Sequence, residues 1–227
     1  MQLREYNRYT RTYADAKQLC VGMFDRHEKY PYEKYLLERY DQRRDRALDF
    51  ACGMGRMINR MLRCFDHVDG VDLNAANLDY AVQYLSGNNW PPDKYRLYQS
   101  NGTGINLTAG DYSFIYSTIA LQHIAVYTIR RKILEDIYRL LRAGGQSCLQ
   151  MGFGWNNGVH WFDNCYTARS TNAGCDVTIP DRSHLPAIEA DLKSIGFKQV
   201  RFELKESPHS EYNDRYHSQW IFIHLWK

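Results

Sequence analysis

A short turn with glycines at positions 53 and 55 has the residue types of a ligand-binding turn. Glycine lets the backbone turn sharply and approach a ligand closely, and a helix that starts there offers unpaired N–H groups. Ile58 stands where a dinucleotide fingerprint requires a third glycine. Arg56 stands where a phosphate-binding P-loop requires lysine. The turn therefore indicates a nucleotide-like ligand, but neither of those two motifs.

Two aspartates flank this turn in the sequence. Asp72 follows Gly53 by about 20 residues and ends the apolar run 67–72, where an acidic side chain accepts hydrogen bonds from ribose hydroxyls. Asp49 precedes the turn directly. Its carboxylate either belongs to the ligand site or caps the following helix and fixes the loop.

The hydrophobic pattern predicts the strands and helices that position these residues. Strand-like runs lie at 46–51, 67–72, 95–99, 113–118, 146–153, 199–205 and 219–226. Helices are expected at 10–23, 32–42, 57–65, 74–85, 129–141 and 185–195, with Ala143-Gly144-Gly145 ending the fifth. Strands that alternate with helices predict a parallel sheet covered by helices on both faces.

Composition sets limits on the function. The chain has 227 residues, 44% of them hydrophobic, which suits a single domain. A net charge of +3 without a clustered basic face makes a nucleic-acid partner unlikely. The six cysteines form no C-x-x-C pair, so we expect no metal site. The first residues are polar and no apolar run reaches the roughly 20 residues of a membrane span, so the pattern predicts a cytoplasmic protein with no membrane partner.

Five segments together resemble the class I S-adenosylmethionine (SAM)-dependent methyltransferases. Residues 48–56 resemble motif I, D-x-G-x-G-x-G, with Ala51 at its first glycine, and 71–73 resemble motif II. Residues 100–103 follow the third strand, where the family often has an acidic residue and this chain has Asn101. Residues 113–124 resemble motif IV and the segment after it, and 140–145 are similar to the L-K-P-G-G turn. The resemblance covers roughly 45–150 and the last two strands.

The family resemblance implies a Rossmann-like α/β fold. We expect a seven-stranded, mostly parallel sheet with an antiparallel terminal strand, helices on both faces and an N-terminal helical cap. Residues 1–227 would form a single domain: the cap at 1–44, a SAM-binding core at 45–154, a substrate-side insertion at 155–184, and a C-terminal helix with two strands at 185–227.

The same resemblance assigns the cofactor-binding residues. Around the motif I turn these are Asp49, Ala51, Gly53, Gly55 and Arg56. Asp72 would hold the ribose hydroxyls, Leu73 would pack on the adenine, and Asn101 and Gly102 would lie at its edge. Ser117 would lie near the sulfonium. Arg56 and Tyr13 are both candidates for the SAM carboxylate.

His123 is the candidate catalytic base, because it follows the fourth strand closely and the ordinary pKa of histidine suits proton transfer near neutral pH. A structural histidine is the alternative. The aromatic insertion after the fifth strand would contact the acceptor, and its candidate substrate-binding residues are Trp155, His160, Trp161 and Tyr166. A loop that only caps the sheet is the alternative there.

We therefore expect a methyltransferase whose acceptor is a small molecule or glycan, methylated at oxygen. Position 117 lacks the N/D-P-P-Y/F signature of amide and adenine methylation, and no P-C dipeptide is present for cytosine C5 chemistry. A methyltransferase acting on RNA or protein is one alternative. A non-catalytic or regulatory SAM-binding protein is another. A monomer and a homodimer are both compatible with the sequence.

Overall fold

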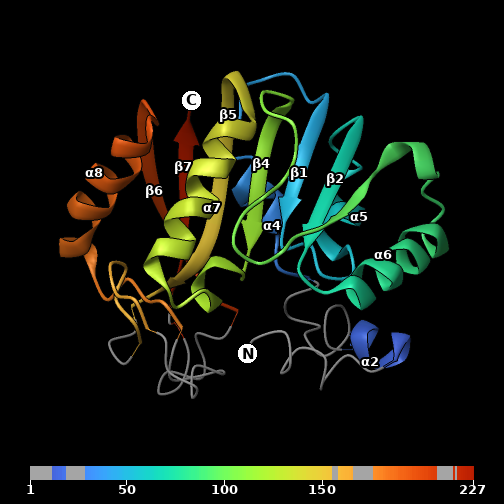
Figure 1. The fold of residues 1–227 in the computed structure, drawn as a ribbon, viewed down its shortest axis with the longest axis horizontal. Coiled ribbons are helices and arrows are strands. Elements are labelled where there is room, and N and C mark those ends of the chain that lie inside the picture. The colour runs from blue at the N-terminus through green and yellow to red at the C-terminus, as the bar shows by residue number, and fades with distance from the viewer. Residues whose placement is uncertain (1–11, 19–28, 155–157, 166–175, 209–216, 218) are drawn as a thin grey trace.

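A seven-stranded sheet forms the centre of the computed structural model, which describes residues 12–18, 29–154, 158–165, 176–208, 217 and 219–227 (Figure 1). The strand order is β3-β2-β1-β4-β5-β7-β6. The strands span the following residues: β1 Arg46–Phe50, β2 His67–Asp72, β3 Leu97–Gln99, β4 Tyr112–Thr118, β5 Leu141–Phe153, β6 Gln199–Glu206 and β7 Gln219–Trp226. β1 to β5 are parallel, and β7 is antiparallel to both β5 and β6. The expected mostly parallel sheet with an antiparallel terminal strand is confirmed.

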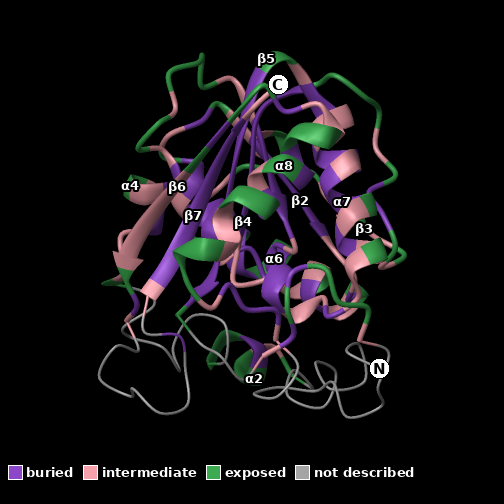
Figure 2. Cartoon of the chain, turned by 90° about the vertical axis from the view of Figure 1, so that its left-hand side faces the viewer, coloured by how far each residue is buried: buried purple, intermediate pink, exposed green. Residues whose placement is uncertain are grey.

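Helices cover both faces of the sheet, as the sequence predicts (Figure 1). One face packs against α4 (Tyr32–Leu36), α5 (Arg56–Met61) and α6 (Ala75–Gly87), and the other against α7 (Tyr127–Leu140) and α8 (Leu185–Ile195). The inner strands β2, β1, β4, β5 and β7 are largely buried, whereas the edge strands β3 and β6 are partly exposed (Figure 2). In α7 the buried side chains Ile133, Ile137 and Leu140 recur at helical spacing, so one stripe of the helix is apolar and faces the sheet.

The N-terminal part of the chain contributes two short helices. Thr12 caps α2 (Tyr13–Lys17), and its hydroxyl accepts a hydrogen bond from the Asp15 backbone N–H. The remaining elements are the 3-10 turns η2 (Pro92–Lys94), η3 (Leu121–His123) and η4 (Arg182–His184). Among the residues described, no helix has the length and apolar character needed to cross a membrane.

Several boundaries differ from the sequence prediction by a few residues, and two of the differences have a clear structural cause. α4 ends at Leu36 rather than near residue 42, because the side chains after it bind β6: Glu38 pairs with Lys205, and Arg39 pairs with Glu203. β5 begins at Leu141 rather than at 146, and the glycines expected to end the helix lie inside the strand. The register shifts there, because Leu141 pairs with Tyr112 and Gln146 with Phe114, so residues 142–145 form a bulge that has no register partner in β4.

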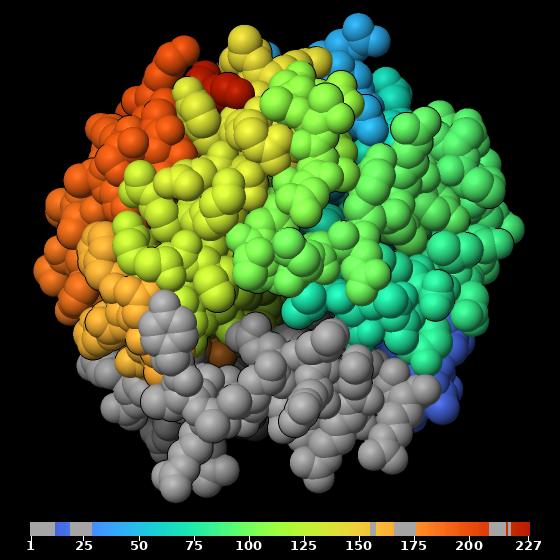
Figure 3. Space-filling model, viewed as in Figure 1, coloured from blue at the N-terminus to red at the C-terminus, as the bar shows by residue number. Residues whose placement is uncertain are grey.

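The loop between β3 and β4 lies along α7, as Figure 3 shows. Asp136 Oδ2 accepts a hydrogen bond from the Ile105 backbone N–H at 2.9 Å. Arg139 donates to the carbonyls of Ile105 and Leu107 at 2.6 and 2.7 Å. These charge-assisted bonds fix the loop that follows the end of β3.

The turn after β1 requires left-handed backbone at three positions. Gly53 and Gly55 have φ of +53° and +83°, which glycine adopts without steric cost. Ala51 has φ of +61°, where its Cβ crowds the following carbonyl oxygen. The alanine that replaces the first motif glycine therefore keeps the glycine conformation and carries local strain.

Ala51→Gly should therefore stabilise the chain. We expect an increase of about 0.5 kcal/mol in the free energy of unfolding, since relief of about 1 kcal/mol of strain exceeds the entropy that glycine adds to the unfolded chain. Urea denaturation measures the change. Ala47→Gly, in the regular part of β1, is the matched control and should destabilise the fold. A loss of stability in Ala51→Gly would contradict the strain argument.

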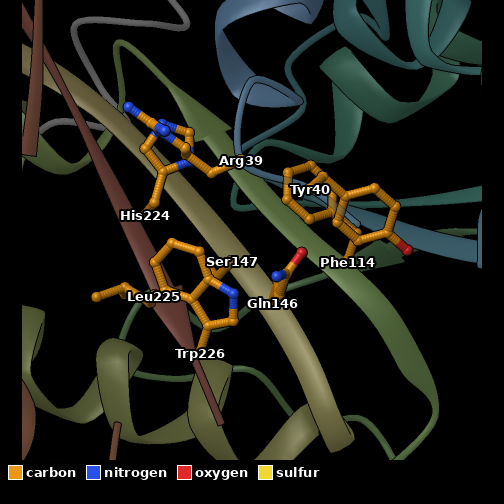
Figure 4. A pocket seen from close by; sticks show the side chains of 8 residues that line it. All are labelled: Arg39, Tyr40, Phe114, Gln146, Ser147, His224, Leu225 and Trp226. Carbon is orange, nitrogen blue, oxygen red and sulfur yellow. The ribbon is translucent and has the colours of Figure 1, made fainter. Parts of the chain in front are cut away.

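A small hollow lies at the opposite end of the sheet, where β5 begins and β7 ends (Figure 4). It is too narrow to hold a water molecule and is bordered by Gln146, His224 and Trp226 among others. His224 is buried, and one ring nitrogen lies 3.8 Å from Cys148 Sγ. Burial lowers the pKa of His224 to about 4, so the folded state holds a neutral imidazole.

This histidine should make the fold sensitive to acid. The unfolded chain binds the proton below about pH 6.5, whereas the folded chain binds it only near pH 4. Above about pH 6.5 this group therefore costs no stability. As the pH drops from there to below the pKa of the folded state, the free energy of unfolding falls by on the order of 3 kcal/mol because of His224. Urea denaturation between pH 4 and 7 should show a shallower dependence for His224→Gln. His184→Gln, at an exposed ring, controls for loss of a histidine, and parallel curves for wild type and His224→Gln would refute the assignment.

Candidate functional site

The carboxyl ends of β1 and β2 carry the predicted ligand-binding residues, at the point where the strand order reverses. β1 lies between β2 and β4, so the chain leaves β1 in one direction and returns on its other side. Such a topological switch point opens a crevice beyond the strand ends, where ligands bind in open α/β sheets. Asp49, Gly53 and Asp72 all lie at this edge.

Asp72 joins the two loops at this edge. Its Oδ2 accepts from the Gly53 N–H and its Oδ1 from the Asn74 N–H, both at 2.8 Å. Burial raises the pKa of Asp72, and these backbone hydrogen bonds oppose the rise. The Asn77 side chain and the Leu73 backbone also stabilise this carboxylate by hydrogen bonding, so hydroxyls of a bound diol would share its acceptor positions with these donors. The side chain thus has a structural role beside the predicted ligand role.

Asp49 is buried beneath the turn, 2% exposed, and pairs with Tyr116 of β4 across the sheet. Its Oδ2 has no hydrogen-bond partner among the described residues. Burial raises its pKa well above the ordinary value, the positive charge of Arg56 opposes the rise, and Asp72 adds to it. A buried carboxylate oxygen without a donor is costly, so it fits a ligand that brings a positively charged donor.

The loop after β3 forms the neighbouring part of the site. Gly102 has φ of +83°, and a Cβ there would lie 3.1 Å from Leu73 Cδ1, so Leu73 and Gly102 pack closely. Asn101 Oδ1 accepts from the N–H and the hydroxyl of Thr103, at 3.0 and 2.9 Å. Both lone pairs of that oxygen are in use, so the predicted adenine contact by Asn101 requires Thr103 to move.

Ser117 and Tyr13 have partners that sequence reasoning missed. Ser117 is buried in β4 and donates to the Phe50 carbonyl at 2.9 Å, which ties β4 to β1. The Tyr13 ring lies edge-on to Tyr80 of α6, with 5.9 Å between ring centres.

Ile119, directly after β4, has φ of +55°, which is rare for a β-branched residue. Its N–H donates to Gln150 Oε1 at 2.8 Å, and this bond helps to hold the strained backbone.

His123 is paired with a carboxylate from a distant part of the sequence. Its Nδ1 lies 2.8 Å from Asp176 Oδ1, although 53 positions separate the two residues. Gln122, next to His123, joins this pair to β5. Its backbone carbonyl accepts from the Val177 N–H at 2.6 Å, and its side-chain Oε1 accepts from the Gly152 N–H at 2.9 Å. The sequence offers no signal for Asp176, because only the path of the insertion brings it to η3.

The predicted substrate-binding residues in the insertion differ in burial and in hydrogen-bond partners. Trp161 is 4% exposed, and its indole N–H donates to Asp191 Oδ2 of α8 at 2.8 Å, which favours a packing role. His160 is exposed, and Asp163 accepts from its backbone N–H rather than from its ring. Trp155 and Tyr166 lie outside the described residues. Nowhere in the described part of the chain do three or more His, Cys, Asp or Glu side chains come together as a metal site would require.

Comparisons with known proteins identify the fold. Residues 47–145 match the family model described as a methyltransferase domain, and none of the curated proteins compared matches the chain. Phosphoethanolamine N-methyltransferase 2 of Haemonchus contortus, solved with phosphomonomethylethanolamine and S-adenosylhomocysteine, has TM-score 0.71 and 16% identity over 100% of this chain. This chain spans 61% of that one, about three-fifths of its length.

Two further structures are similar. A methyltransferase of Haloferax volcanii, solved with the Trm112 activator and called putative, has TM-score 0.66 and 16% identity, with 100% of this chain and 97% of that one covered. A sarcosine dimethylglycine methyltransferase of Galdieria sulphuraria, also called putative, has TM-score 0.60 and 14% identity, with 82% and 78% covered.

The matched segment contains β1 to β4, the glycine turn and Asp72. The motifs, the strand order and the family model agree on one assignment. Residues 47–145 match a methyltransferase domain, and the chain has the fold of solved methyltransferases that hold SAM or S-adenosylhomocysteine.

Proposed function

We propose that this protein is a SAM-dependent methyltransferase that methylates a small molecule or glycan at oxygen, with His123 as the general base. The observation that carries this proposal is the 2.8 Å contact between His123 Nδ1 and Asp176 Oδ1. A carboxylate that accepts the Nδ1 proton leaves a lone pair on Nε2, so the ring is oriented to take a proton.

The cofactor residues support the proposal through their unused capacity for hydrogen bonding. Asp72 offers a buried carboxylate at the end of β2 for the ribose hydroxyls, and the buried Asp49 Oδ2 lacks the donor that the ammonium at the methionyl end of SAM would supply. Bound SAM supplies a methyl group on a sulfonium, which is a good leaving group. The protein's part is then to align the acceptor with that methyl and, for an alcohol, to remove its proton.

The acceptor atom follows from the need for a base. A hydroxyl is a weak nucleophile until it loses its proton, whereas a neutral amine already has a lone pair. A histidine oriented by a carboxylate therefore favours an oxygen acceptor. The similarity to a phosphoethanolamine N-methyltransferase makes a nitrogen acceptor the second candidate.

The wider setting is also part of the proposal. Cys52, Cys64, Cys148 and Cys165 are free thiols, which is compatible with the reducing cytoplasm. A net charge of +3 supports a small acceptor over RNA. The chain would act as a monomer or homodimer.

Replacing the proposed base should abolish most of the turnover. We expect His123→Gln to lower kcat by about 100-fold or more, and Asp176→Asn to lower it less, with the dissociation constant for SAM unchanged in both. Production of S-adenosylhomocysteine from SAM, measured with a panel of sugars, phenols, hydroxy acids and amines, identifies the acceptor first. Full turnover in His123→Gln would overturn the base assignment. SAM binding without any turnover would instead favour a non-catalytic SAM-binding protein.

Asp72 should be needed for cofactor affinity. Asp72→Ala should weaken S-adenosylhomocysteine binding by about 10- to 100-fold, because two charge-assisted hydrogen bonds to the ribose are lost. Calorimetric titration measures this, and thermal unfolding reports the separate loss of the bonds to Gly53 and Asn74. Asp66→Ala, at an exposed site before the start of β2, is the matched control. Unchanged affinity in Asp72→Ala would show that the cofactor lies elsewhere.

A further inference from the structure

We propose, on the basis of the proposed function, that Gln150 of β5 binds the methyl acceptor: its side-chain Nε2 donates a hydrogen bond to an oxygen atom of that molecule. The acceptor would then carry a second oxygen, such as a neighbouring hydroxyl, beside the atom that receives the methyl group. Diols, sugars and hydroxy acids have such a pair of oxygens. The substrate class is thereby narrower than a small molecule or glycan.

The Gln150 side chain lies near the carboxyl end of β5 and is fully buried. In the sheet the residue pairs with Thr118 of β4 and with Phe222 of β7. Its carboxamide reaches past Thr118 to Ile119, the first residue after β4, whose backbone N–H donates to Gln150 Oε1 at 2.8 Å. The amide therefore lies at the edge of the sheet where open α/β folds bind their ligands.

The contact with Ile119 fixes which way the amide points. A carboxamide has one oxygen that accepts and one nitrogen that only donates, and a backbone N–H needs the oxygen. Nε2 of Gln150 must then point away from Ile119. This nitrogen is buried, and in the part of the chain that the structure describes it has no hydrogen-bond partner. A buried donor without an acceptor destabilises a fold, which is explained here if a ligand supplies the acceptor.

The surroundings of the amide give a ligand a direction of approach. Thr118 and Ile119 are both only partly buried, so the carboxamide lies directly beneath the surface of this edge. Ile119 also has left-handed backbone, with φ of +55°. Strained backbone in a β-branched residue persists where the surrounding structure holds it, and such positions cluster at ligand sites.

The proposed base is carried by the segment that Gln150 helps to hold. Residues 119–123 run from the end of β4 to His123, and β5 binds this segment at two places. Gln150 accepts from the Ile119 N–H, and the Gly152 N–H donates to Gln122 Oε1 at 2.9 Å. The unpaired donor and the base thus belong to one hydrogen-bonded unit. A molecule with two oxygens can present one to His123 and the other to Nε2.

The chemistry of the donor decides between the two candidate kinds of acceptor. An amide N–H binds an atom with a lone pair, such as a hydroxyl, carbonyl or carboxylate oxygen. An ammonium group has no lone pair and gains nothing at this position. Gln150 therefore favours an oxygen-rich acceptor over an amine.

Pairs of probes that differ by one hydroxyl provide the test. These are catechol and phenol, glycerate and lactate, methyl glucoside and each of its monodeoxy forms, and ethanolamine and ethylamine. Each is titrated by calorimetry into the complex with S-adenosylhomocysteine, so binding is measured without turnover. The proteins are the wild type, Gln150→Met, and Gln146→Met as the matched control. Gln146 is buried in the same strand but binds Asp41, outside the proposed site.

We expect the wild type to bind the hydroxyl-bearing member of one oxygen pair about 10-fold or more tightly than the member that lacks the contacted oxygen. Gln150→Met should bind the two members within about twofold of each other, because methionine has a similar length and no donor. Gln146→Met should keep the wild-type ratio. Loss of the bond to Ile119 affects both members equally, so the ratio isolates the contact made by Nε2.

A second measurement needs no variant and reports even where Gln150→Met fails to fold. In wild-type protein isotope-labelled in its glutamine side chains, the magnetic resonance signal of the Gln150 amide should shift when the tighter member of the pair is added. The signal should stay in place with the member that lacks the contacted oxygen. A trapped water as the true partner of Nε2 would leave the signal unchanged with both.

Three outcomes would overturn the inference. An equal ratio in Gln150→Met and the wild type, or an unmoved amide signal on binding, makes Gln150 only a structural tie between β4 and β5. Binding of ethanolamine and ethylamine alone refutes both this inference and an oxygen acceptor. If the complex with S-adenosylhomocysteine binds none of the probes, the inference fails together with the proposed function, whereas binding with an unchanged ratio refutes the inference alone.

Discussion

The hydrogen bonds from the Gly53 and Asn74 N–H groups to the carboxylate of Asp72 are the contacts on which the proposed site depends. They connect the turn after β1 to the start of α6, across the point where the strand order reverses. Together with the Cys52 N–H, which donates to the Val71 carbonyl at 3.1 Å, they fix the turn relative to β2. Asp72 itself is held against backbone donors at this edge of the sheet.

The candidate ligand-binding residues and the strained backbone lie at the same edge of the sheet, where the parallel strands end. Ala51 and Ile119 both adopt left-handed backbone, one after β1 and one after β4. Asp49, in β1, is buried with an oxygen that has no partner among the described residues. Strained backbone and unsatisfied polar atoms cost stability, and both occur at the edge where the ligand is proposed to bind.

Local pattern was enough to predict the fold, and it placed the candidate cofactor residues at one edge of the sheet. The β2 and β7 bounds and the α8 bounds agree with the apolar runs, because each is a regular element with a clear period. Motif spacing placed Asp49, Gly53 and Asp72 together because the carboxyl ends of parallel strands share an edge. The end of α4 was predicted wrongly, since Glu38 and Arg39 bind β6, a contact with no trace in local sequence.

Long-range contacts explain what the sequence could not predict. Asp176 reaches His123 only through the path of the insertion, and Trp161 is enclosed because Asp191 of α8 accepts from its indole. Neither contact can be predicted from a hydrophobic period or from a motif in the sequence. Tyr32 is similar: its ring lies against Arg56 because α4 packs on α5 and β7.

Hydrogen–deuterium exchange of the chain with and without S-adenosylhomocysteine tests the placement of the cofactor most directly. The account predicts slower exchange in 49–56, 71–77 and 100–104, the three segments that meet at the carboxyl edge of β1, β2 and β3. Unchanged exchange in these segments, or protection confined to the hollow beside Gln146 and Trp226, would contradict it.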